Sequence, residues 1–123
     1  MLALVVDDSR TVRIIVGTIL REIGMDVIEA GNGRQALEQI KANPDVELVL
    51  LDWNMPEMNG LAFIEAVRAE PAYNGIRILM VTSETESDQV TRALNAGANE
   101  YLMKPFNKDI LVAKLNLLDV LQE

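Results

Sequence analysis

Short runs of apolar residues alternate along the chain with longer segments in which apolar residues recur every three or four positions. The short runs are typical of strands that are buried on both faces, and the periodic segments are typical of amphipathic helices. The pattern predicts strands at residues 2–6, 26–30, 47–52, 77–82 and 101–103.

The periodic segments that follow these strands predict five helices. They cover residues 12–23, the segment from Asn32 to Asn43, the segment around 61–67, residues 87–96, and the C-terminal segment after Asn107. Asn32 and Asn107 are predicted N-caps, while Gly24 and Gly97 are predicted helix stops. Strands that alternate with helices predict βαβ units, and therefore one α/β domain over residues 1–123 with a parallel sheet covered on both faces. No linker or additional effector domain is expected.

Composition narrows the possible functions. The chain has 123 residues and a net charge of −8, with no Cys and no His. The acidic balance argues against binding to nucleic acid or to an anionic membrane surface. The missing residue types exclude thiolate metal sites and a phosphohistidine carrier. Since there is no secretion signal and no apolar run of membrane-spanning length, a cytoplasmic location is expected.

The residues at the carboxyl ends of the predicted strands fit a single site. Each has an ordinary explanation taken alone: an Asp as a turn former or helix cap, a Thr as a strand former, a Lys as a solvated charge. Parallel strands, however, end at one edge of the sheet, where ligands of open α/β sheets bind. The residues concerned are Asp7 and Asp8 after the first strand, Asp52 on the third, Thr82 on the fourth and Lys104 after the fifth.

Three carboxylates without His or Cys form an oxygen-only site that suits Mg²⁺. Such a cation also explains how two adjacent negative charges, Asp7 and Asp8, are tolerated. Asp52 would retain a carboxylate oxygen able to accept a phosphoryl group. Mg²⁺ and the ammonium of Lys104 could neutralise the phosphoryl oxygens, and Thr82 could donate one hydrogen bond to them.

The motifs VVDDS, LDWNMPEMNG, MVTSE and KPF carry a family resemblance. In their order and spacing the chain resembles response-regulator receiver domains over its whole length, and most closely the single-domain chemotaxis regulators. The resemblance implies a flavodoxin-like fold with strand order 2-1-3-4-5. It implies a two-component switch in which Asp52 receives a phosphoryl group from the phosphohistidine of a sensor kinase. Mg²⁺ would be held by Asp7, Asp8, Asp52 and the backbone carbonyl of Asn54.

The resemblance also implies roles for residues around the acceptor. Lys104 would pair with the phosphoryl group, and the Lys104–Pro105 peptide bond would be cis. Thr82 would move toward the phosphoryl group and Tyr101 would follow, so that both are switch residues. The face formed by the fourth helix, fifth strand and fifth helix would bind a downstream protein, with Lys114 as a candidate contact. Asn54 and Glu84 occupy positions that tune the loss of the phosphoryl group.

Three other kinds of protein share part of this pattern. An Asp-nucleophile phosphatase would need an Asp two residues after the nucleophile, where this chain has Asn54. A flavin-binding carrier would need a phosphate loop in place of Asp7 and Asp8, which repel phosphate. A receiver domain from a longer transcription regulator would have the same acceptor chemistry. The expected protein is a phosphoacceptor switch, not an enzyme, because it catalyses only its own phosphorylation and dephosphorylation.

Overall fold

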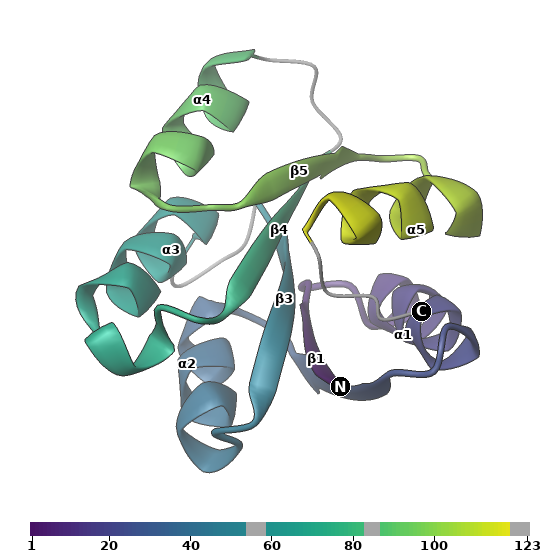
Figure 1. Cartoon of the computed structure of the whole chain (residues 1–123), viewed down its shortest axis with the longest axis horizontal. Helices are drawn as coiled ribbons and strands as arrows, with labels where there is room; N and C mark the ends of the chain where they lie inside the picture. The colour runs from purple at the N-terminus through teal and green to yellow at the C-terminus, as the bar shows by residue number, and fades with distance from the viewer. Residues whose placement is uncertain (54–58, 83–86, 119–123) are drawn as a thin grey trace.

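A five-stranded parallel sheet forms the centre of the molecule (Figure 1). The computed structural model describes residues 1–53, 59–82 and 87–118. The strands are β1 (Leu2–Val6), β2 (Asp26–Ala30), β3 (Val46–Asp52), β4 (Arg77–Thr82) and β5 (Glu100–Met103). Their order across the sheet is β2-β1-β3-β4-β5, which confirms the flavodoxin-like arrangement.

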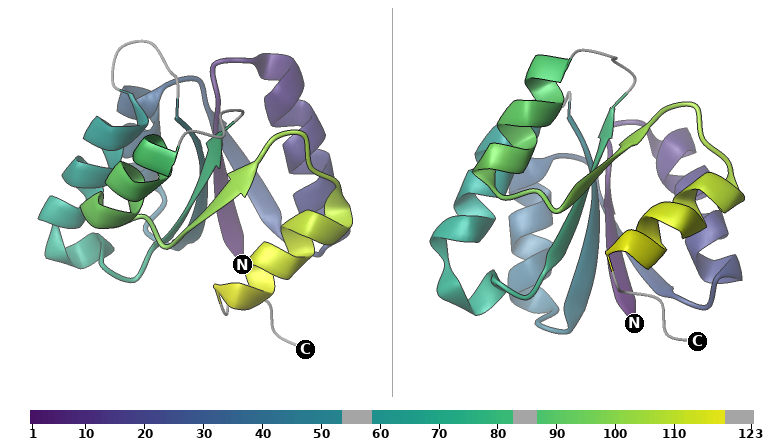
Figure 2. Two further views of the ribbon diagram at one scale, coloured as in Figure 1. Left: turned by 90° about the horizontal axis from the view of Figure 1, so that it is seen from above. Right: turned by 45° about the horizontal axis from the view of Figure 1, so that its top comes forward.

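Helices cover both faces of the sheet (Figure 2). They are α1 (Arg10–Glu22), α2 (Gly33–Ala42), α3 (Gly60–Ala69), α4 (Ser87–Ala96) and α5 (Lys108–Leu117). Side chains of α1 and α5 pack into one buried apolar cluster with the sheet, and those of α2, α3 and α4 pack into the other. Within the described residues, no helix has the length and apolar character needed to cross a membrane.

Polar side chains begin the helices where the sequence indicates. Asn32 and Asn107 are N-caps, as predicted, because their side chains accept hydrogen bonds from the backbone N–H groups of Gln35 and Ile110. Ser9 caps α1 in the same way, so that this helix begins at Arg10, two residues before the first apolar residue of its periodic pattern. Each cap satisfies a backbone donor that has no partner within its own helix.

Two strands begin one residue earlier than predicted, and one short helix was not predicted. β3 begins at Val46 and β5 at Glu100, because sheet pairing extends beyond the apolar run in each case. The unpredicted element is a 3₁₀ turn at Pro71–Tyr73, which is too short to show a helical period. None of these differences moves a residue at the carboxyl ends of the strands.

Arg68 on α3 joins three segments at the opposite edge of the sheet from those carboxyl ends. Its guanidinium donates hydrogen bonds at 2.7–3.1 Å to the carbonyl oxygens of Gly97, Tyr73 and Ile76 and to the side-chain oxygen of Asn99. Burial, and secondarily the charge of Arg77, lowers the pKa of Arg68. The end of α4 is therefore tied to α3 and to the beginning of β4.

The Arg68 side chain makes Gly97 a sensitive position. Gly97 has φ +121°, and an added Cβ would lie 2.5 Å from Cγ of Arg68. Gly97→Ala should lower the free energy of unfolding more than Gly24→Ala, which should cost about 1–2 kcal/mol for positive φ alone. Gly24 has φ +101° with no atom near the added Cβ, and Gly75 has neither constraint. Urea unfolding of the three variants checks this order, and a Gly97→Ala variant as stable as Gly75→Ala would contradict it.

Candidate functional site

The register of the sheet brings the ends of four strands together. Val6 of β1 pairs with Leu51, next to Asp52 of β3. Asp52 pairs with Val81 of β4, and Thr82 pairs with Met103 of β5. Since all strands are parallel, Asp7, Asp8 and Lys104 follow at the same edge as Asp52 and Thr82. The predicted convergence of these five residues at one edge is therefore present.

Asp7, Asp8 and Asp52 form a compact acidic cluster. One carboxylate oxygen from each residue lies within 4.8 Å of the others. Asp7 is buried, with 4% of its surface exposed, whereas Asp8 is exposed and Asp52 half-buried. A cluster of oxygen donors that combines a buried and an exposed carboxylate fits a hard cation that keeps part of its water shell, such as Mg²⁺.

The buried carboxylate of Asp7 has a partner on each oxygen. Oδ1 accepts a hydrogen bond from the backbone N–H of Ser9 at 2.9 Å. Oδ2 accepts one from Nζ of Lys104 at 3.2 Å. The backbone N–H of Asp7 donates to the carbonyl oxygen of Ala30 at 3.1 Å. Both the main chain and the side chain of Asp7 are consequently held in place, as expected for a buried charge.

Lys104 supplies the positive charge within the cluster. Its Nζ lies 3.2 Å from Oδ2 of Asp7 and 3.8 Å from Oδ1 of Asp52. Its backbone N–H donates to the carbonyl oxygen of Thr82 at 2.7 Å, and the Lys104–Pro105 bond is cis. The ammonium therefore lies beside both carboxylates, closer to that of Asp7, the more deeply buried of the two.

Thr82 and Tyr101 lie on the same face of the sheet. Thr82 pairs with Met103, and Tyr101 is two residues before Met103 on β5, so that their side chains share a face. Thr82 is buried, with 1% exposed. Nζ of Lys114 lies 4.2 Å from the centre of the Tyr101 ring and 3.3 Å from Oε1 of Glu100. α5 is thereby joined to the edge strand β5 beside the Tyr101 ring.

Two predicted site residues, Asn54 and Glu84, lie outside the described residues.

Two residues that contact Asp7 were not predicted from the sequence. The backbone N–H of Ser9 donates to Asp7, a contact that does not depend on the residue type, so that the sequence signals only the N-cap role of Ser9 and not this contact. Arg13 donates to the carbonyl oxygen of Asp7 at 2.6 Å. An arginine in an amphipathic helix is too ordinary for the sequence to indicate that contact.

Comparison with known proteins decides the family. The family model of the response regulator receiver domain matches residues 3–116. The chain belongs to the response regulator receiver domain family. Receiver domains are components of two-component signalling, so this assignment does not favour a phosphatase or a flavin carrier.

Similar receiver proteins match nearly the whole chain. Chemotaxis protein CheY1 of Helicobacter pylori strain J99 is 45% identical over 118 residues, which cover 95% of both chains. A CheY homologue of Campylobacter jejuni is 47% identical over 116 residues, covering 94% of this chain and 89% of the relative. The solved structure of chemotaxis protein CheY4 of Vibrio cholerae is 36% identical, with a TM-score of 0.88 and 98% of each chain covered.

Binding of Mg²⁺ to the acidic cluster of this receiver domain should change the fluorescence of Trp53. Trp53 directly follows Asp52 and is the only tryptophan, with 9% of its surface exposed. The fluorescence change should saturate as Mg²⁺ is added. The affinity should be modest, because Mg²⁺ gives up its bound water reluctantly. Asp8→Asn should weaken binding at least about tenfold, since even outer-shell losses cost roughly 10–100-fold.

Asp26→Asn is the matched control, because Asp26 is an exposed acid at the beginning of β2, at the end of the strand away from the acidic cluster. It should leave the Mg²⁺ titration nearly unchanged. A wild-type titration without saturation, or an Asp8→Asn titration that superimposes on that of the wild type, would show that the cation does not bind at this cluster.

Proposed function

We propose that the protein is a Mg²⁺-dependent response regulator that accepts a phosphoryl group on Asp52 from the phosphohistidine of a sensor kinase. The observation that carries this proposal is the convergence of three carboxylates and the Lys104 ammonium at the end of β3. Asp52 ends β3, the central strand of the sheet, and it is only half-buried, so a donor can reach its carboxylate. The same proposal places the protein with its kinase in the cytoplasm.

The transfer is a substitution at phosphorus. A carboxylate oxygen of Asp52 attacks the phosphorus atom, the P–N bond of the donor breaks, and its electron pair remains on the imidazole nitrogen. Asp7, Asp8, Asp52 and the carbonyl of Asn54 would hold Mg²⁺, which supplies positive charge to the phosphoryl oxygens when bound. The Lys104 ammonium, anchored 3.8 Å from Asp52, provides a second positive charge, and the Thr82 hydroxyl provides a hydrogen-bond donor.

The identity of the acceptor can be tested by intact mass. With a small phosphodonor such as acetyl phosphate and Mg²⁺, the wild type should gain one phosphoryl group, and it should remain unmodified without Mg²⁺. Asp52→Asn should gain none, because an amide is not a phosphoryl acceptor. Asp45→Asn, which alters an exposed acid in the loop before β3, is the control and should react as the wild type does. A phosphoryl group gained by Asp52→Asn at the wild-type rate would refute the assignment.

We further propose that the phosphoryl group changes the face formed by α4, β5 and α5, and that this face binds the downstream protein. Movement of the buried Thr82 toward the phosphoryl group would leave space on the face of the sheet that it shares with Tyr101. The ring of Tyr101 is the large side chain placed to enter it. Its departure would give up the contact with Lys114, whose Nζ lies 4.2 Å from the ring centre.

The contact between Lys114 and Tyr101 has an energetic consequence for the switch. Glu100 fixes Lys114 by an ion pair at 3.3 Å and accepts the backbone N–H of Tyr101 at 3.0 Å. A cation over an aromatic ring contributes about 0.5–1 kcal/mol at an exposed site. Phosphorylation can move Tyr101 only if it favours the altered state by more than such contacts favour the present one.

The names of the similar proteins support a role in chemotaxis. CheY1 of Helicobacter pylori and the CheY homologue of Campylobacter jejuni are described as chemotaxis proteins. We propose a role of the same kind for this chain, with a sensor kinase as phosphodonor and one or more downstream proteins as targets. Neither nucleic acid binding nor membrane insertion is part of the proposal.

Magnetic resonance can test the coupling between Asp52 and the partner face. Beryllofluoride, a phosphoryl mimic, should shift backbone signals around Asp52 and also in residues 88–114 of the wild type. In Thr82→Ala the second group of shifts should largely disappear, because the hydroxyl that connects the two regions is missing. Thr18→Ala is the control, since the Thr18 hydroxyl donates only locally to Ile14 at 2.8 Å. Shifts in residues 88–114 that survive in Thr82→Ala would contradict the proposed route.

A further inference from the structure

We propose that Arg13 is a positioning residue for the metal site, which it serves by fixing the peptide unit between Asp7 and Asp8. The inference rests on the proposed function, since it assumes that these acids hold Mg²⁺. Arg13 lies on α1, and it touches neither the carboxylate of Asp7 nor that of Asp52 in the contacts that the structure describes. Its action is through the main chain.

The Asp7 carbonyl lies where β1 has ended. The strand stops at Val6, and the N–H of Asp7 still donates to Ala30 of the neighbouring strand at 3.1 Å. The carbonyl oxygen of Asp7 accepts instead from Nη1 of Arg13 at 2.6 Å. This oxygen belongs to the planar peptide unit that links Asp7 to Asp8, so its direction determines how the chain turns toward Asp8. Asp8 itself is exposed, and packing does not fix it.

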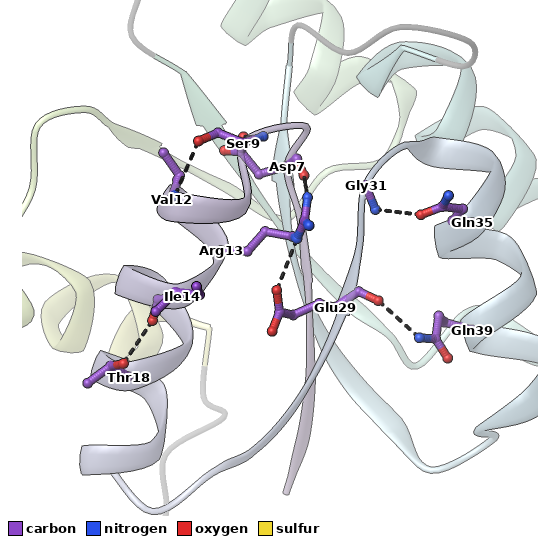
Figure 3. A network of polar contacts seen from close by, with 10 residues as sticks. All are labelled: Asp7, Ser9, Val12, Arg13, Ile14, Thr18, Glu29, Gly31, Gln35 and Gln39. Carbon is purple, nitrogen blue, oxygen red and sulfur yellow. Dashed lines mark hydrogen bonds and ion pairs between the residues drawn. The ribbon is translucent and has the colours of Figure 1, made fainter.

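The guanidinium of Arg13 is itself oriented by a second contact (Figure 3). Its Nε donates to Oε1 of Glu29 on β2 at 3.0 Å, and the Arg13 side chain is only 17% exposed. The backbone carbonyl of Glu29 accepts a hydrogen bond from Nε2 of Gln39 on α2 at 3.0 Å. The planar fork of an arginine can make both contacts in a fixed geometry, whereas a lysine ammonium cannot span the same two acceptors in that geometry.

The charges provide a way to separate positioning from electrostatics. Removing a positive charge near three carboxylates makes the site more negative, which by itself should tighten the binding of a divalent cation. Removing Arg13 also leaves the carboxylate of Glu29 without its partner, which adds to that effect. If Arg13 positions the acids, its loss should instead weaken binding, because the turn that carries Asp8 loses its anchor. The two explanations therefore predict changes of opposite sign.

The test is a Mg²⁺ titration of the full chain followed by Trp53 fluorescence. Arg13→Gln should raise the Mg²⁺ dissociation constant by about tenfold or more, the usual cost of losing a partner behind the metal ligands. Arg13→Lys, which keeps the charge and loses the fork, should raise it as well. Arg10→Gln is the matched control, because Arg10 is exposed on the same helix and carries the same charge; it should leave the constant unchanged or lower it.

Phosphorylation by acetyl phosphate gives a second measurement. If Arg13 had a merely structural role, its replacement would not change the Mg²⁺ dependence of the rate. The Mg²⁺ concentration for half-maximal rate should rise in Arg13→Gln and Arg13→Lys, while the rate at saturating Mg²⁺ should approach that of the wild type. Affinity in both Arg13 variants that is unchanged or tightened, as in Arg10→Gln, would overturn the inference, as would a rate that high Mg²⁺ fails to restore. A wild type that binds no Mg²⁺ would instead refute the proposed function itself.

Discussion

The crowding of three negative charges at one edge of the sheet is the constraint on which the rest of the site depends. Asp7 and Asp52 cannot move apart, because Asp7 directly follows β1 and Asp52 ends β3, two strands whose register is fixed by burial on both faces, and Asp8 is the next residue after Asp7. Carboxylates within 4.8 Å of one another repel, and in this structure the Lys104 ammonium partly neutralises them. A divalent cation would complete that neutralisation, and the same positive charge would favour an incoming phosphoryl group.

The two ends of the parallel strands differ: the carboxyl ends carry the acidic cluster, and at the opposite ends Arg68 binds backbone carbonyl groups. At the carboxyl ends of the strands, main-chain contacts hold Asp7 through Ala30 and Arg13, and hold Lys104 through Thr82. At the other edge, the Arg68 guanidinium donates to the carbonyl oxygens of Gly97, after α4, and Ile76, before β4, and to the side-chain oxygen of Asn99, before β5. At each edge an arginine therefore donates to backbone carbonyl oxygens. Of the two, only Arg13 lies beside residues with a proposed chemical role.

The sequence predicted most of the architecture, because burial on both faces makes strands readable as apolar runs and makes their ends coincide. The site residues followed from that topology and their phosphoryl chemistry from the residue types, whereas the strand order, the switch roles of Thr82 and Tyr101 and the kinase donor came from the family resemblance. What could not be predicted is contact between side chains from different elements. That Lys104 lies nearer to Asp7 than to Asp52 depends on relative burial. That Arg13 reaches both Glu29 and Asp7 depends on how α1 packs against the sheet.

The central claim is that repulsion among these carboxylates is balanced by a bound cation, and the free energy of unfolding tests it most directly. It should be measured with and without Mg²⁺ for the wild type and for Asp52→Asn. Without Mg²⁺ the variant should be the more stable protein, since one of the crowded charges is gone. Mg²⁺ should stabilise the wild type as a ligand of the folded state and stabilise the variant much less. A variant that is less stable without Mg²⁺, or that gains as much from it as the wild type, would contradict the account.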